Sequence, residues 1–242
     1  MRSRLDDAEQ HAILQLPIHT IHVRANADFV RLDESVDHVS VVAEGIVGRF
    51  DQTAEGTRQI TALHLPGDAA DLHSVALPRA RSALQALTPA TILRVSHASL
   101  RSAMAQYPAI TEAFWRDGIV DQAVQSQWMV NLGRRDAKAR IAHLLCEVAC
   151  RTGAVADNHA EFSLPVTQQH LSEVTGLTAV HVNRTLRALR EENLIHAEGR
   201  QLTILDFASL ARVADFTAGY LQMAVAFGEP ERIVALPQGE PS

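Results

Sequence analysis

The segment Thr167-Gln-Gln-His-Leu-Ser-Glu-Val-Thr-Gly-Leu-Thr-Ala-Val-His-Val-Asn-Arg-Thr-Leu-Arg-Ala-Leu-Arg190 decides the fold of this chain. Thr167 and Thr178 each stand where a side-chain oxygen can accept hydrogen bonds from the free N–H groups at the start of a helix. Gly176 lies between them and tolerates the positive φ that a sharp turn needs. The segment therefore predicts two short helices, the first ending near Thr175, joined by a glycine turn.

Each predicted helix has one apolar stripe and one free face. Leu171 and Val174 lie three residues apart on the first helix, and Val182, Leu186 and Leu189 repeat at four and three on the second. At about 100° per residue, the opposite side of the second helix gathers a different set. This set is Ala179, Val180, Asn183, Arg184 and Arg187, with His181 on the flank.

The free face of the second helix suits the major groove of DNA. Arginine can donate to guanine O6 and N7 together, asparagine can pair with adenine, and arginines farther along can neutralise phosphates. No acid lies between residues 178 and 190, and residues 194–205 alternate around Glu198-Gly199-Arg200 as a hairpin does. We therefore predict a winged helix-turn-helix that binds DNA through Thr167, Gln168, Gln169, Thr178, Ala179, Val180, His181, Asn183, Arg184 and Arg187. The alternative is a surface helix with three solvated arginines.

Composition limits the classes of protein to consider. The chain has 242 residues, 47% of them hydrophobic, and a formal net charge of −6. That length suits two domains, and DNA affinity must come from a local basic patch. Cys146 and Cys150 are four apart without a second pair, which favours buried free thiols over a reactive dithiol and argues against a metal or iron–sulfur site. Because neither a long apolar run nor a signal peptide is found, we expect a cytoplasmic location.

The first hundred residues have the pattern of an antiparallel β-barrel or sandwich. Short β-type runs separated by turn residues occupy residues 29–32, 39–42, 45–50, 59–65, 83–87 and 91–95. From Ser99 the pattern becomes helical. The β part is therefore followed by helices.

A long helix is predicted over residues 110–131. One apolar side is expected to contain Phe114, Ile119, Val124, Trp128 and Met129. A second copy of the chain could cover that side, which would give a two-fold dimer on a palindromic DNA site. Packing against the β domain of the same chain is the alternative. Asp136 is placed to cap a further helix over residues 137–150.

The order of β-barrel, long helix and winged helix-turn-helix resembles the Crp/Fnr superfamily of bacterial transcription regulators over about residues 15–215. The matching stretches are Leu65-Pro-Gly-Asp68, Arg81-Ser-Ala83, Asn131-Leu132, Asp136, Arg140-Ile-Ala142 and the helix-turn-helix through Gly199. The resemblance implies an α+β fold: a cyclic-nucleotide-binding-like antiparallel β-barrel (jelly roll) at 1–109, a dimerisation helix and hinge at 110–135, a winged helix-turn-helix DNA-binding domain at 136–217 and a tail at 218–242. It also implies a homodimer, with double-stranded DNA and RNA polymerase as partners.

The resemblance points to an effector site in the barrel but not to ordinary cyclic AMP binding. In the cyclic-AMP-binding members, a glutamate binds the ribose and an Arg-Ser pair binds the phosphate. Arg81 and Ser82 match the pair and Ser126 falls near the base, yet residues 68–74 lack the glutamate. An unpaired ribose hydroxyl costs about 1–3 kcal/mol, so we expect a small effector other than cyclic AMP in its usual pose. The candidate effector residues are Asp71, His73, Ser74, Arg81, Ser82 and Ser126.

The second predicted helix also departs from the best-known family pattern. Val180 stands where a glutamate would accept from cytosine, and Ala179 replaces an arginine, whereas Arg184 is retained. We therefore expect Val180 to contact a thymine methyl group.

Three functions stay open at this point. The first is a dimeric regulator of transcription that is not an enzyme. The second is a ligand-binding barrel protein, an enzyme or carrier, whose helical part only dimerises; no catalytic spacing in the barrel favours it. The third is a regulator without a ligand, controlled by its abundance.

Overall fold

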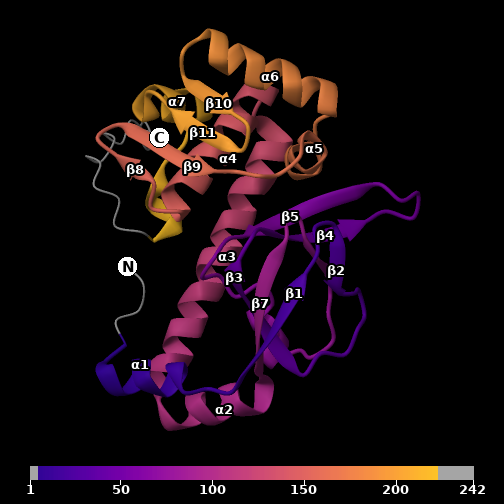
Figure 1. Ribbon diagram of the computed structural model, residues 1–242, viewed down its shortest axis with the longest axis vertical. Helices are drawn as coiled ribbons and strands as arrows, with labels where there is room; N and C mark the ends of the chain where they lie inside the picture. Colours follow the sequence, from indigo (N-terminus) through magenta and orange to yellow (C-terminus); the bar gives the residue numbers. More distant parts are fainter. Residues whose placement is uncertain (1–4, 223–242) are drawn as a thin grey trace, which may run out of the picture.

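The computed structural model describes residues 5–222 and contains β structure in its first half and a mixed domain in its second. Figure 1 shows the long helix α3 running alongside the β structure and leading to the mixed domain at the opposite end of the molecule. This order is the one predicted. The predicted tail beyond residue 222 lies outside the described residues.

Two antiparallel sheets form the N-terminal domain, which we call the sensor domain. One has the strand order β1-β7-β3 and the other β2-β6-β4-β5. The strands are β1 Ile18–Val23, β2 Ala27–Val30, β3 His38–Glu44, β4 Val47–Gln52, β5 Arg58–His64, β6 Ala83–Ala86 and β7 Ala90–Ser96. Val42, Val47, Leu84 and Ile92 are buried together between them. The short helix α1 (Asp7–Leu14) and the 3-10 turn η1 (Leu72–Val75) complete this domain.

The predicted strands are present, and two of them are shifted by two residues. The strand expected at 29–32 is Ala27–Val30, because the chain turns at Asp33, whose φ is +63°, and Leu32 is exposed. The strand expected at 45–50 starts only at Val47, after Gly45 with a φ of +86°. Both corrections have one physical reason, which is that a residue with positive φ interrupts an extended strand.

The helices α2 (His97–Gln106) and α3 (Pro108–Arg134) follow the sheets. The prediction of a single apolar side on α3 is wrong. Val124 and Trp128 are buried against the chain itself, whereas Ile119 and Met129 are exposed. At about 100° per residue, Met129 lies a quarter turn away from Trp128, so α3 has an inner and an outer apolar face.

The helix α4 (Ala137–Arg151) is the core of the second domain. Asp136 caps it as predicted, accepting from the N–H of Ala139, and every residue from 141 to 150 is buried. Cys146 and Cys150 are free and buried, as predicted. Burial raises the pKa of both thiols, that of Cys150 to about 12, so neither is a reactive thiolate at neutral pH.

The winged helix surrounds α4. The helices α5 (Gln168–Thr175) and α6 (Ala179–Glu191) precede the hairpin of β10 (Ile195–Glu198) and β11 (Gln201–Ile204), which turns at Gly199 with a φ of +59°. The strands β8 (Val155–Ala156) and β9 (His159–Ser163), which were not predicted, extend this sheet in the order β10-β11-β9-β8. The helix α7 (Phe207–Ala214) packs on α4, and the turn η2 (Ala218–Leu221) follows.

Two classes of feature are absent from residues 5–222. A bilayer-crossing helix would need more length and more apolar character than any helix described there. Groups of three or more His, Cys, Asp or Glu that could hold a metal ion are also not found within that range.

Candidate nucleic-acid interface

The turn between α5 and α6 fixes how α6 leaves the domain. Thr167 accepts from the N–H of His170 and Thr178 from the N–H of His181, so both predicted caps are confirmed. Gly176 has a φ of +64°, and a Cβ added there would lie 2.8 Å from Leu132 Cδ2. Glycine is therefore favoured at this turn mainly by the positive φ, because the nearest atom to the added Cβ is the end of a flexible side chain.

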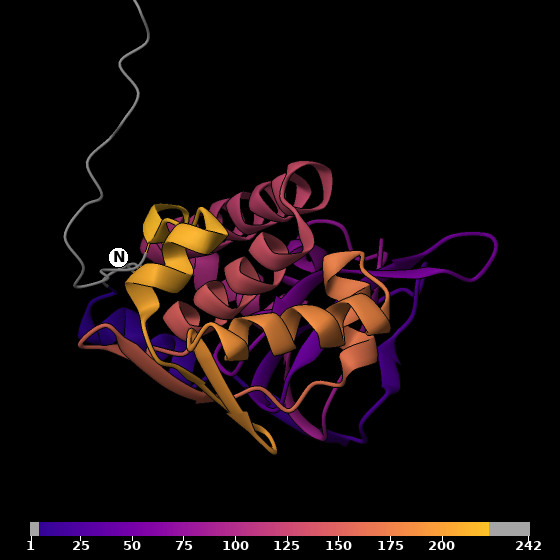
Figure 2. The same ribbon diagram turned by 90° about the horizontal axis from the view of Figure 1, so that it is seen from above.

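The helix α6 has a buried side and an open side, as its spacing predicted. Val182 and Leu189 are fully buried, whereas Val180 is 70% exposed. Figure 2, which views the molecule from above, shows α6 crossing its surface with no other helix or strand over it. The open side is therefore accessible to a large partner.

Six of the predicted DNA-binding residues line one shallow groove on this open side. They come from both helices: Gln168, Ala179, Val180, Asn183, Arg184 and Arg187. Asn183 Nδ2 donates to Gln168 Oε1 at 3.4 Å, which links the two helices across the groove. Thr167, Thr178 and His181 are exposed beside it. Gln169 is exposed as well, but its side chain donates to Glu173 within α5.

The charges on α6 are not equivalent. Arg187 forms an exposed ion pair with Glu191 at 2.7 Å, and the hydrogen bond raises the pKa of the guanidinium. Arg184 is exposed and has no ion pair or hydrogen bond to another residue within the described part of the chain. Sequence reasoning missed Glu191 because it lies just beyond the acid-free stretch, although its spacing of four from Arg187 was a readable signal.

The candidate effector residues are dispersed and mostly engaged. Asp71 is buried and accepts from the N–H of Ser40 at 2.6 Å and from its hydroxyl at 3.1 Å. Ser74 is buried and lies 2.8 Å from His97 Nε2. Burial raises the pKa of Asp71 despite those hydrogen bonds. Asp71 and Ser74 therefore tie the turn η1 to the strands and to α2.

The Arg-Ser pair does not form an empty anion site. Ser82 donates to a carboxylate oxygen of Asp51 at 3.1 Å, and Arg81 is exposed. The carboxylate of Asp51 would repel a phosphate bound at Ser82. This contact could not be predicted from the sequence, because Asp51 is 31 residues away from Ser82.

The contact between the barrel and α3 includes an ion pair that the prediction did not include. Buried Arg49 donates to both carboxylate oxygens of Asp121 on α3, at 3.2 and 2.9 Å. His73 is exposed near this pair; desolvation, and then the charge of Arg49, lower its pKa. Ser126 lies on the outer side of α3 and donates to the carbonyl oxygen of Gln122.

Comparison with known proteins identifies the family. A family model described as a cyclic nucleotide-binding domain matches residues 20–107, and one described as a Crp-like helix-turn-helix domain matches residues 139–213. The nitrogen fixation regulation protein FixK of Azorhizobium caulinodans is 28% identical over 190 residues, 78% of this chain and 76% of that protein. The chain belongs to the Crp/Fnr family.

Other members of the Crp/Fnr family are similar along most of their length. The transcriptional activator protein FnrL of Cereibacter sphaeroides is 26% identical over 216 residues, 86% of this chain and 85% of that protein. The solved structure of FixK2 from Bradyrhizobium japonicum superposes with a TM-score of 0.74 at 26% identity, covering 82% of this chain and 98% of that one.

Membership of the Crp/Fnr family separates a regulator of transcription from the enzyme or carrier that the sequence left open. The relatives are regulators of transcription rather than enzymes, and the matching domain is a helix-turn-helix. The chain is therefore a DNA-binding transcription regulator of the Crp/Fnr type. An enzyme or carrier whose helical part only dimerises is not supported.

Proposed function

We propose that two copies of this chain pair along α3 and place their α6 helices in successive major grooves of a palindromic promoter site. The observation that carries this proposal is the groove on α6, which gathers Arg184, Asn183 and Val180 on an open surface around an arginine without a partner in the described chain. The groove itself would read the bases, and the caps of α5 and α6 would lie near phosphates.

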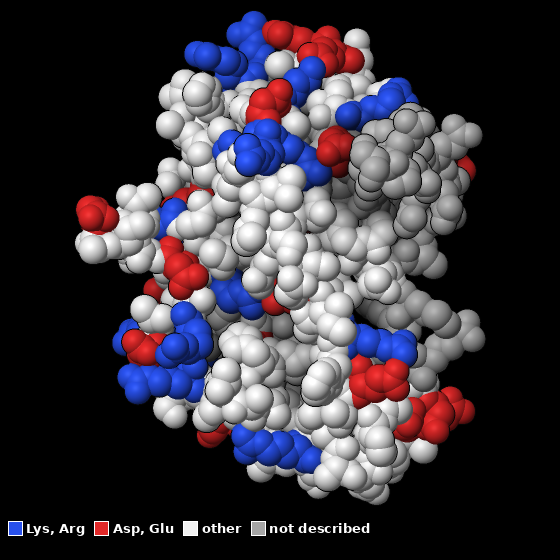
Figure 3. Space-filling model, turned by 180° about the vertical axis from the view of Figure 1, so that it is seen from behind, with Lys and Arg blue, Asp and Glu red and all other residues white. Residues whose placement is uncertain are grey.

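The outer face of α3 supports the pairing of two copies. Trp115, Ile119 and Met129 are 71%, 59% and 71% exposed, and with Gln122 and Ser126 they repeat at spacings of three and four. This is the spacing of a helix that packs against a second helix. In Figure 3 a central strip of the rear face is mostly white apart from one group of charged side chains, and other charged side chains lie above it, below it and at the left edge. An apolar strip of this kind is expected to be covered by a partner.

The chemistry of each residue in the groove suggests which base it would contact. Arg184 would donate to guanine, Asn183 would pair with adenine, and Val180 would contact a thymine methyl group. Arg187 is already paired with Glu191, so we assign it to a phosphate rather than to a base. We also propose that the DNA-bound dimer contacts RNA polymerase and that the protein acts in the cytoplasm.

Replacing Arg184 by alanine should weaken specific DNA binding by about 1–3 kcal/mol and leave the fold intact. The wild-type chain first selects its site from random DNA, and gel shifts with that site then compare the variants. Arg212→Ala is the matched control, because it removes the same charge from an exposed position on α7. Equal affinity of the Arg184 variant and the wild type would remove Arg184 from the interface. Binding should also weaken steeply with added salt.

Replacing Ile119 by aspartate should weaken dimerisation by about 2–3 kcal/mol, because two-fold symmetry places two copies of the side chain in the interface. Sedimentation equilibrium measures the change directly. Leu77→Asp is the control, since Leu77 is similarly exposed, at 62%, but lies outside α3. A dimer of unchanged affinity in the Ile119 variant would show that α3 does not carry the interface.

We further propose that any effector is a small molecule other than cyclic AMP in its usual pose. Two features support this: the carboxylate of Asp51 beside Ser82, and the Arg49–Asp121 pair where the barrel meets α3. Melting curves with cyclic nucleotides, haem and small acids test it, because a ligand that binds only the native state must raise the midpoint. A rise with cyclic AMP that Arg81→Ala abolishes would contradict this part of the proposal.

A further inference from the structure

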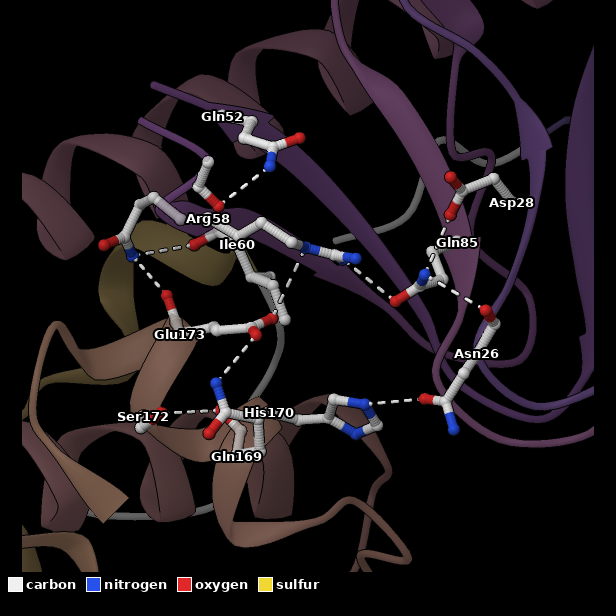
Figure 4. A network of polar contacts seen from close by, with 12 residues as sticks. Asn26, Asp28, Gln52, Arg58, Ile60, Gln85, Gln169, His170, Ser172 and Glu173 are labelled. Carbon is white, nitrogen blue, oxygen red and sulfur yellow. Dashed lines mark hydrogen bonds and ion pairs between the residues drawn. The ribbon is translucent and has the colours of Figure 1, made fainter. Parts of the chain in front are cut away.

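The helix α5 is attached to the sensor domain at both of its ends. Figure 4 shows a ring of polar contacts that runs from α5 through Arg58 and Gln85 to Asn26 and back to α5. Except for the contacts within α5, every contact in the ring joins residues that are separated by more than 25 positions in the sequence. The ring therefore holds one domain against the other.

Gln59 caps the C-terminal end of α5. Its Nε2 donates to the carbonyl oxygens of Glu173 and Val174, at 2.6 and 3.1 Å. Arg140 Nη1 donates to the carbonyl oxygen of Thr175 at 3.2 Å. The last carbonyls of a helix have no partner inside it. Two of the free carbonyls of α5 are thus satisfied by the sensor domain rather than by its own domain.

Arg58 adds a charged contact at the same end. Its Nε lies 3.7 Å from the Glu173 carboxylate, and its guanidinium carbon lies 3.7 Å from the centre of the Phe50 ring. Its Nη2 donates to Gln85 Oε1 at 2.9 Å. Because Arg58 and Glu173 are both largely buried, the pair is shielded from solvent.

His170 and Asn26 join the other end of α5 to the sensor domain. His170 Nδ1 accepts from the N–H of Thr167, so its Nε2 carries the proton and donates to Asn26 Oδ1 at 2.9 Å. Gln85 Nε2 donates to the backbone carbonyl oxygen of Asn26, which closes the ring. Rotation of α5 away from the sensor domain would break contacts at both ends.

A second attachment lies at the far end of β5. Arg151, the last residue of α4, donates to the Asp68 carboxylate at 2.6 Å and to the carbonyl oxygen of Leu63 at 2.7 Å. The strand β5 therefore contacts α5 through Gln59, near the start of the strand, and α4 through Leu63, near the end of the strand. Two separated attachments fix an orientation, whereas one would allow the domain to pivot.

We propose that Gln59, Arg58 and Asn26 are positioning residues that set the spacing between the two half-sites of the DNA palindrome. Only the turn at residues 176–178 separates α5 from α6, so the attachment of α5 also fixes the direction of α6. This inference rests on the proposed dimer that pairs along α3. In such a dimer the distance between the two α6 helices depends on how each winged helix is held against its sensor domain.

The test compares DNA duplexes whose half-sites are moved together or apart by one base pair, which changes their separation by about 3.4 Å and a tenth of a turn. The variant combines Gln59→Ala with Asn26→Gly. Both substitutions leave the net charge unchanged, and both remove hydrogen bonds to α5 rather than to α6. Glycine tolerates the φ of +63° at Asn26. Gln52→Ala is the control, because Gln52 lies on the same hairpin but donates to Gly56 and not to α5.

We expect the wild type and the Gln52 control to prefer the selected spacing by about tenfold, and the double variant to lower this preference to about threefold or less. Binding of the double variant to a single half-site should stay within about twofold of wild type. A purely structural role would weaken binding to all duplexes equally, so an unchanged spacing preference overturns the inference. Gln59→Ala alone replaces the double variant if melting curves show the latter unfolded. Failure of the wild type to bind any palindrome as a dimer would instead contradict the proposed function.

Discussion

Replacement of Glu147 by alanine is expected to destabilise the protein by about 3–5 kcal/mol. Glu147 is fully buried, and its carboxylate accepts from Trp128 Nε1 at 3.0 Å, from the Tyr220 hydroxyl at 2.9 Å and from Arg151 at 3.2 Å. The substitution leaves the buried Trp128 N–H and the half-buried Tyr220 hydroxyl without this acceptor, and it removes one of the two carboxylates around Arg151. Because Trp128 belongs to α3 and Tyr220 to η2, the loss affects three elements at once.

Urea denaturation at neutral pH measures this effect. Glu147→Gln should lie between wild type and the alanine variant, because an amide oxygen still accepts hydrogen bonds but does not neutralise Arg151. Glu161→Ala serves as the control, since Glu161 is exposed on β9. A loss below about 1 kcal/mol for Glu147→Ala would mean that the carboxylate does not hold these elements together.

The local features of the helix-turn-helix could be predicted from the sequence because their causes are local. A threonine cap reaches an N–H three residues away, and the turn at Gly176 depends mainly on its own φ. The open face of α6 follows from the helical period and the buried Val182 and Leu189. The DNA contacts themselves stay a prediction.

Features that depend on distant partners could not be predicted. In the sequence nothing distinguishes Glu147 from an exposed charged residue on a helix. Only the fold shows that Trp128, Tyr220 and Arg151 surround it. Ser82 meets Asp51 for the same reason. The periodicity of α3 does not separate its two apolar faces, because the sequence alone does not show what covers each side of a helix.

The strand β5 connects these observations. It carries Gln59 against α5 near its start, and the carbonyl of Leu63 near its end accepts from Arg151, which also binds Glu147. A change in the barrel that moved β5 would therefore reach both attachments of the winged helix at once. An effector could act on DNA binding along this strand without contacting the winged helix itself.

The stability of the protein should fall as the pH drops below about 6.5, and His143 should account for about 2 kcal/mol of the loss at pH 5. Asn131 Oδ1 accepts from Arg135, so its amide nitrogen faces His143 and donates to Nδ1, which must be unprotonated. The rings of Phe216 and Tyr220 pack against the His143 ring, with distances between ring centres of 5.1 and 6.0 Å. Burial, and then the charge of Arg135, lower the pKa of His143 to about 3.

The direction of this effect follows from proton binding. Between about pH 6.5 and pH 3 the unfolded chain binds a proton at residue 143 that the folded chain does not, so each unit of acidification favours unfolding by about 1.4 kcal/mol. Above pH 6.5 both states are neutral at this position and the contribution is constant.

Denaturation of wild type and His143→Gln at several pH values isolates the effect, because the other titrating groups cancel in the difference. The two stabilities should converge as the pH falls, whereas His196→Gln, at an exposed position on β10, should follow the wild type throughout. Parallel profiles for wild type and His143→Gln would show that His143 is protonated in the fold at mildly acidic pH, and that its hydrogen bond to Asn131 is not the one described here.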